Sequence, residues 1–294
     1  MEFYRQQNVT STKIFSIKHL HGLDINEYPA IANTFSLGNI LMTYLNPNYV
    51  LIPFQQLLGN CQNNVLLGLR LSERVEKFPD PTDEELQFMQ IYLNGHITDI
   101  RQSKIQYKQW ILKNGFEEIH NCIRITLERL YVYKEIEVEL KANPSANLTD
   151  RENELKLRAN KFNFPDLTNN INHRLAEPLQ YQKHIETINN ARNCFVHRNG
   201  IVGSKDFNNS DKDKLIITGN RFKMFFKKGE EETPAMLGKL GPENAALMLG
   251  AEEFAIEFES GKSIDISLKQ FIDILNTCIF FNADIDLILN GNVA

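Results

Sequence analysis

The segment Asn189–Gly200 holds the residues with the clearest potential for chemistry. Arg192 is followed directly by Asn193, and His197 comes five positions after Arg192. Asn193 and His197 share one face of a helix, while Arg192 is rotated by roughly 140° from His197 but carries a long side chain. A guanidinium can hold a phosphate, an amide can orient it, and an imidazole can transfer a proton near neutral pH. These groups suit a metal-free cleavage of RNA, in which the 2′-hydroxyl loses a proton and the leaving 5′-oxygen gains one.

The same three residues resemble the active-site signature of the HEPN superfamily, in which four to six residues separate an Arg from a His. A polar residue, often Asn, commonly follows the Arg, and Arg192, Asn193 and His197 fit this pattern with four residues between the Arg and the His. The resemblance covers little more than a dozen residues. It implies a helical bundle that cleaves RNA without a metal or another cofactor, works as a homodimer, and often serves as a toxin or in phage defence.

The resemblance also assigns roles. His197 would act as general base or acid, Arg192 would stabilise the charge on the phosphate, and Asn193 would orient the phosphate or the imidazole. Because each chain supplies a single His of this kind, a two-fold dimer would bring two His197 side chains into one cleft. RNA is then the expected substrate, and an antitoxin or a sensor protein is a possible partner.

Three other interpretations stay open. Arg192 and His197 can simply be solvated cations that the dipole favours at the end of a helix. The chain can also be a non-catalytic HEPN-like module that recognises a protein partner or a nucleotide. The third interpretation is an adaptor whose N-terminal region docks a partner while the strands near the C-terminus sense a ligand.

A second basic segment follows the motif. On a strand, alternate residues of Arg221–Lys228 share one face, so that cations and an aromatic ring could together bind single-stranded RNA. The alternative is a half-buried strand whose solvent face is basic. With the cation that follows His197, the hypothesis names these RNA contacts: Arg198, Arg221, Lys223, Phe225 and Lys227.

Composition limits the class of protein. Hydrophobic residues make up 42% of the 294 residues, charged residues make up 23%, and the formal net charge is −5. A folded globular chain is expected, and a protein that coats nucleic acid non-specifically is not, because that needs an excess of basic residues. The four cysteines are widely spaced, which favours reduced, buried thiols in a cytoplasmic protein. The motif contains no carboxylate cluster for a metal, and no stretch predicts a signal peptide or a membrane span.

The motif needs a helix to hold it. Apolar residues at three- and four-residue spacing predict a helix over Leu175–Arg198, with Pro178 near its start. Asn199-Gly200 is a helix stop in which Gly200 suits the left-handed conformation.

The whole chain is expected to be mainly α. Residues 1–80 form an N-terminal helical region with helix-period leucines in 29–45 and 53–78, and Pro79-Asp80-Pro81 ends it. Residues 81–294 form the HEPN-like helical domain. Its first helix starts at a capping box, Thr82 with Glu85, and is interrupted at Asn114-Gly115.

A small antiparallel β insertion at about 213–267 is predicted before the last helix. Gly219-Asn220 and Ser260-Gly261 would supply hairpin turns, a short helix would occupy Pro242–Leu249, and Ser267 with Gln270 would cap the last helix. The predicted strands are Leu215–Ile217, Arg221–Lys227, Glu253–Phe258 and Ile264–Ile266.

Overall fold

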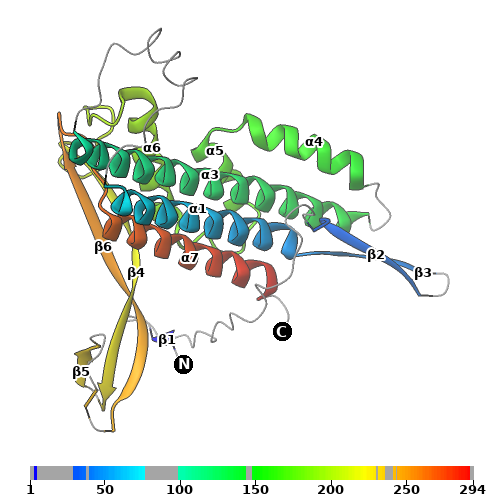
Figure 1. The fold of residues 1–294 in the computed structure, drawn as a ribbon. Coiled ribbons are helices and arrows are strands. Elements are labelled where there is room, and N and C mark those ends of the chain that lie inside the picture. Colours follow the sequence, from blue (N-terminus) through cyan, green and yellow to red (C-terminus); the bar gives the residue numbers. More distant parts are fainter. Residues whose placement is uncertain are drawn as a thin grey trace.

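Long helices form the centre of the fold, and a twisted β-ribbon runs across them and continues beyond them (Figure 1). In this computed structural model the described residues are 3–4, 29–37, 40–76, 99–143, 148–229, 231–235, 241–242 and 244–291. The helices are α1 (Asn48–Arg74), α3 (Ile100–Ala142), α4 (Leu148–Lys161), α5 (Phe164–Asn172), α6 (Gln182–Arg198) and α7 (Leu268–Asn290). The strands are β1 (Phe3–Tyr4), β2 (Ala32–Leu37), β3 (Ile40–Leu45), β4 (Lys214–Lys228), β5 (Glu231–Pro234) and β6 (Ala246–Glu259). A mainly α fold with a small sheet before the last helix is therefore confirmed.

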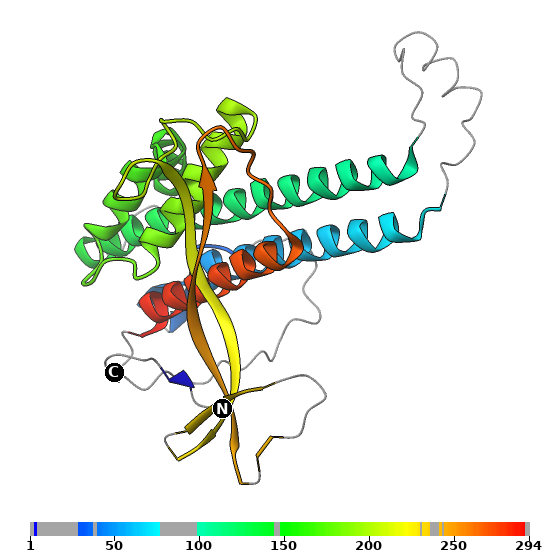
Figure 2. The ribbon, with the colours of Figure 1, turned by 90° about the vertical axis from the view of Figure 1, so that its left-hand side faces the viewer.

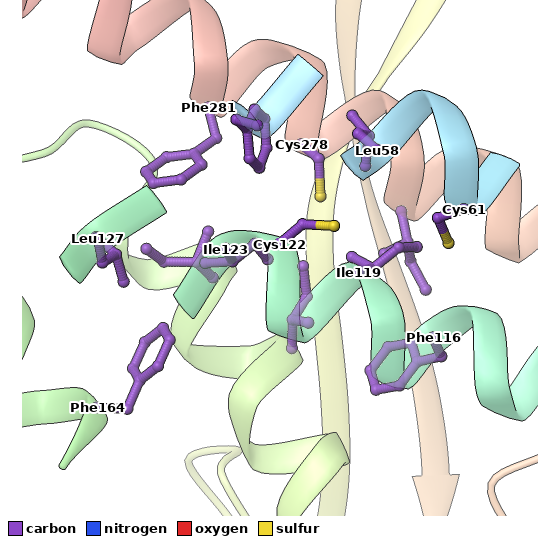
Figure 3. Close-up of a cluster of buried hydrophobic side chains, with 14 of the residues drawn as sticks. Leu58, Cys61, Phe116, Ile119, Cys122, Ile123, Leu127, Phe164, Cys278 and Phe281 are labelled. Atoms are coloured by element: carbon purple, nitrogen blue, oxygen red, sulfur yellow. The ribbon is translucent and has the colours of Figure 1, made fainter. Parts of the chain in front are cut away.

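Helices α1, α3 and α7 pack side by side around one apolar core (Figure 3). Phe116, Ile119 and Phe281 are fully buried there. Cys61 and Cys122 lie in the same core, and burial raises the pKa of each of their thiols to about 12. All four cysteines are free and buried, as their spacing predicted, and thiols with such raised pKa values are unreactive near neutral pH.

Helix α3 runs without a break through Asn114-Gly115, so the predicted interruption there is wrong. A Cβ atom on Gly115 would lie 2.4 Å from Cγ2 of Val65 and 2.9 Å from Cε2 of Phe271. Glycine costs a helix interior about 1 kcal/mol relative to alanine. At this position it permits the close approach of α1 and α7, and the packing gained offsets that cost.

The N-terminal region is only partly helical. The helix predicted over 53–78 is confirmed as α1, but 29–45 forms the antiparallel hairpin β2–β3 in place of a helix. The residues between these strands are Gly38 and Asn39, a pair that favours tight hairpins. Because α1 shares the core of α3 and α7, a boundary at residue 80 does not separate two cores. The capping box predicted at Thr82 lies outside the described residues, as does the helix predicted to follow it up to residue 98.

The β insertion consists of longer strands than expected. Gly219-Asn220 lies inside β4 and makes no turn, and the helix predicted at Pro242–Leu249 is wrong because β6 begins at Ala246. Residues 264–266 form no strand. The sheet order is β1-β6-β4-β5, with β1 parallel to β6 and the other pairs antiparallel. Beyond the helices, β5 pairs with the distal end of β4 (Figure 2).

Strand β4 is fastened to the helices through threonine hydroxyls. Thr187 of α6 accepts the backbone N–H of Thr218, and Thr277 of α7 accepts that of Asn220, both at 3.0 Å. A Cβ atom on Gly219 would lie 2.1 Å from the Thr277 hydroxyl oxygen, so only glycine permits this approach. These two hydrogen bonds satisfy two backbone N–H groups on the edge of β4 that faces the helices. A neighbouring strand would otherwise have to supply the acceptors.

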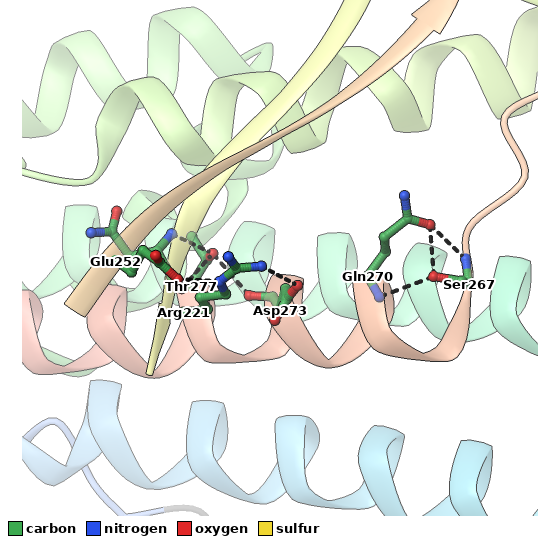
Figure 4. A network of polar contacts seen from close by, with 7 residues as sticks. Arg221, Glu252, Ser267, Gln270, Asp273 and Thr277 are labelled. Atoms are coloured by element: carbon green, nitrogen blue, oxygen red, sulfur yellow. Dashed lines mark hydrogen bonds and ion pairs between the residues drawn. The ribbon is translucent and has the colours of Figure 1, made fainter. Parts of the chain in front are cut away.

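The predicted C-terminal end of α6 and the predicted start of α7 are both confirmed. Helix α6 ends at Arg198, and Asn199 and Gly200 follow in the left-handed region with φ of 52° and 77°. The N–H of Gly200 donates to the carbonyl of Cys194 at 3.1 Å. Helix α7 starts with the predicted capping box of Ser267 and Gln270 (Figure 4). Helix α6 itself begins later than expected, at Gln182, because Pro178 and the turn around it precede the helix.

Candidate functional site

The candidate motif occupies the last two turns of α6. His197 is exposed, while Arg192 and Asn193 are partly buried. The buried stripe of α6 sets the rotation of the helix and so the directions in which these three residues leave it. That stripe consists of Ile185, Ile188, Ala191, Cys194 and Phe195.

Within the described ranges, the side chains of Arg192, Asn193 and His197 have no hydrogen bond or ion pair to another protein group. Arg198, the residue after His197, does form an ion pair. Nε of Arg198 lies 2.6 Å from Oδ2 of Asp206, and a second guanidinium nitrogen contacts the other carboxylate oxygen. Asp206 is only 4% exposed, and its carboxylate also accepts the N–H of Gly203 at 2.9 Å.

This ion pair changes the role of Arg198. The hydrogen bond with Asp206 raises the pKa of the guanidinium, which is already permanently charged. Because its charge neutralises a buried carboxylate, Arg198 is not the free RNA-binding cation that the sequence suggested. It ties the end of α6 to the loop that follows.

Arg192 and His197 lie on different sides of α6. His120 of α3 is buried, and its Nε2 lies 3.1 Å from Oδ1 of Asn189. Burial lowers the pKa of His120 to about 4, and the nearby charges of Arg192 and Arg124 act in the same direction. Arg192 is therefore close to α3, whereas His197 is at the solvent-exposed end of the helix.

A hollow of about 190 Å³ lies between α6 and the loop after it. Asn190 and Asn193 line it and share one helix face with His197, at spacings of three and four residues. Of its lining, sequence reasoning singled out only Asn193 and Arg198. It missed the loop residues because no local pattern predicts that the 203–207 loop folds back against α6, and it missed Asn190 because this residue lies outside the motif. The complete lining is Asn190, Asn193, Arg198, Lys205, Asp206 and Phe207.

The basic strand candidates lie elsewhere, on β4. Arg221 lies where the strand passes α7, and Phe225 and Lys227 lie where it pairs with β5 beyond the helices (Figure 2). Arg221 is paired with Glu252 of β6 at 2.8 Å and with Asp273 of α7 at 3.6 Å (Figure 4). Its guanidinium thus bridges two elements of the fold. This arrangement favours the structural interpretation of Arg221 over a role in binding RNA.

Lys223 and Phe225 pack against each other. Nζ of Lys223 lies 5.3 Å from the centre of the Phe225 ring and 3.6 Å from a carboxylate oxygen of Glu232. Phe225 is only 6% exposed, so its ring is not presented for stacking with a base as the hypothesis required. Lys227 is opposite Glu232 in the β4–β5 ladder, which again adds an acidic neighbour to the strand.

Neither a metal-binding cluster nor a membrane-spanning helix is found among the described residues. Across the part of the chain that the structure describes, no group of three His, Cys, Asp or Glu side chains is arranged to hold a metal ion. In the same residues, no helix combines the length and apolarity needed to cross a bilayer.

Comparison of the chain with protein-family models, with curated proteins and with solved structures finds no match.

Proposed function

We propose that the chain is a metal-independent endoribonuclease of the HEPN type. The observation that carries this proposal is the contrast at the end of α6. Arg192, Asn193 and His197 have no protein partner among the described residues, while the adjacent Arg198 is held by Asp206. A guanidinium, an amide and an imidazole that have no partner among the described residues can bind a ligand, and together they suit a phosphodiester.

The reaction is an attack of the RNA 2′-hydroxyl on the adjacent phosphorus. A His197 imidazole takes the 2′-hydroxyl proton as the new P–O bond forms, and a protonated imidazole gives a proton to the 5′-oxygen as its bond to phosphorus breaks. Arg192 stabilises the charge that gathers on the phosphate oxygens, and Asn193 orients them. The products are a 2′,3′-cyclic phosphate and a free 5′-hydroxyl.

The proposed mechanism needs one imidazole as base and another as acid, and it therefore implies a homodimer. One imidazole cannot easily act as base and acid in the same step, and Arg192 and His197 of one chain leave α6 on different sides. A second copy would supply the missing imidazole. Val196, which precedes His197, and Ile201, which follows the end of α6, are 47% and 46% exposed and offer apolar surface for that contact. The proposed setting is a cytoplasmic toxin or phage-defence effector, controlled by an antitoxin or a sensor protein.

The test is RNA cleavage by the purified protein in excess EDTA. We expect single-stranded RNA to be cut and the 5′ fragment to end in a 2′,3′-cyclic phosphate or its 3′-phosphate product. Activity that disappears with the chelator and returns with Mg²⁺ contradicts the proposal, because the mechanism uses no metal ion.

A non-catalytic HEPN-like binding or adaptor module is the second candidate. It is favoured by the proximity of Arg192 to His120 on α3, away from His197. On this alternative the wild-type protein binds RNA, a nucleotide or a protein partner without cleaving RNA. Light scattering tests the composite site separately, because full nuclease activity from a monomer at micromolar concentration would remove the reason for proposing a dimer.

A further inference from the structure

We infer that the hollow beside α6 is a base-binding subsite that selects adenine next to the scissile phosphate. The inference rests on the proposed nuclease function for its substrate class, RNA, and adds a specificity that the motif alone does not contain. It is carried by the hollow of about 190 Å³, its amide lining and its fixed wall.

Two amides supply the hydrogen-bonding groups. Asn190 and Asn193 are partly buried, and within the described residues neither side chain has a protein partner. The Asn190 amide offers a donor and an acceptor side by side, the pattern that pairs with N6 and N7 of adenine, while the Asn193 amide beside it orients the phosphate. Because both share the helix face of His197, a base held here would place its own phosphate near the imidazole.

The loop side of the hollow supplies the remaining contacts. Phe207 lines the hollow with a partly exposed side chain, and bases of single-stranded RNA commonly stack on such rings. Lys205 is exposed, and the described part of the chain contains no ion-pair partner for it, so its charge is available to a phosphate. Neither residue lies in the motif, which explains why the pattern of Arg192 and His197 gives no indication of base preference.

The wall of this hollow is held in place before any ligand binds. Asp206 receives both Arg198 and the N–H of Gly203, and this fixes the 203–206 turn against α6. A site whose groups are already positioned loses less conformational entropy on binding. The same ion pair argues against guanine, because Nε and one terminal nitrogen of Arg198, a donor fork that could read guanine O6 and N7, are occupied by Asp206.

The direct test measures nucleotide binding by the full-length His197→Ala protein, which the proposed mechanism renders unable to cleave. We expect 3′-AMP to bind more tightly than 3′-GMP, 3′-CMP or 3′-UMP in isothermal titration calorimetry. Asn190→Ala should weaken 3′-AMP binding on the order of 10-fold, the usual scale for losing a paired contact to a base. Asn153→Ala, the same change on the exposed face of α4, is the matched control and should leave binding unchanged.

A second measurement needs no change in the hollow. In ¹⁵N-resolved NMR spectra of the same protein, the side-chain amide signals of Asn190 should shift on titration with 3′-AMP, while those of Asn153 should not. Equal affinity for all four nucleotides, or unchanged Asn190 signals at saturation, overturns the inference.

The nuclease proposal and the subsite can fail separately. Wild-type protein that cuts RNA after every base at equal rates, and does so equally with Asn190→Ala, removes the subsite but leaves the nuclease. Protein that binds 3′-AMP selectively through Asn190 but cuts no RNA keeps the subsite and removes the nuclease.

Discussion

Arg198 and Asp206 form a paired contact between the end of α6 and the following loop, with Nε of the arginine 2.6 Å from Oδ2 of the aspartate. The aspartate is buried and the arginine is partly exposed. The pair distinguishes two basic residues that are neighbours in the sequence, because Arg198 is bonded to Asp206 while His197 is exposed.

Arg198→Ala should lower the free energy of unfolding by about 2 kcal/mol, because it leaves the Asp206 carboxylate buried without a cation. Urea denaturation monitored by circular dichroism measures this loss. The double variant Arg198→Ala with Asp206→Ala should recover part of the stability, since it removes the unpaired charge. If the single arginine variant is as stable as the wild type, the ion pair does not hold the loop.

His197→Ala should reduce RNA cleavage on the order of 100-fold or more, the usual scale for losing a general acid or base. Its stability should change by at most about 1 kcal/mol, since His197 is an exposed residue in the last helical turn. His173→Ala is the matched control, because His173 is exposed at the end of α5 and lies outside the motif. Equal cleavage by the two folded variants, measured on one labelled RNA, means that the nuclease assignment is wrong.

Arg192→Lys should also lose most of the cleavage activity although it keeps the charge. An ammonium group cannot make the paired contacts to two phosphate oxygens that a guanidinium makes. Lys183→Ala, an exposed cation earlier on α6, should retain wild-type activity in the same assay. Full activity of Arg192→Lys would show that Arg192 provides no more than general positive charge.

Thr277→Val should destabilise the protein by about 2 kcal/mol, because the backbone N–H of Asn220 loses its acceptor where β4 meets α7. The control is Thr126→Val in the middle of α3. Thr126 is equally buried, but its hydroxyl donates to a carbonyl of its own helix at Cys122, so its removal should cost less than about 1 kcal/mol. Equal losses for the two variants in urea denaturation would contradict a fastening role for Thr277.

His120 should make stability depend on pH. Its pKa is about 4 in the folded protein and 6.5 ordinarily, so between these values the unfolded state binds more protons. The free energy of unfolding therefore rises with pH across this window. The stability that follows from keeping His120 neutral is fully present above pH 6.5. It is lost progressively as the pH falls towards 4, and the free energy of unfolding then decreases by about 3 kcal/mol in total. Urea denaturation at several pH values should show a shallower dependence for His120→Gln, and an unchanged dependence would contradict the burial of a neutral His120.

The sequence by itself determined the features that depend on neighbouring residues. Asn199-Gly200 ends α6 because these two residues tolerate the left-handed backbone that follows a helix. Ser267 and Gln270 start α7 because each side chain bonds the backbone of the other within one turn. The placement of Arg192 and His197 on one helix end follows from the same local rules.

Tertiary structure decided what depends on residues far apart in the chain. Gly115 continues α3 because Val65 and Phe271 occupy the space that a side chain would need, and Gly219 continues β4 because Thr277 approaches it. Arg198 is held in an ion pair because Asp206 lies beside it, and the position of Asp206 depends on the fold of the 203–207 loop. Local patterns record the conformations that a residue allows, whereas packing and long-range hydrogen bonds select among them, and these contacts form only when the whole core assembles.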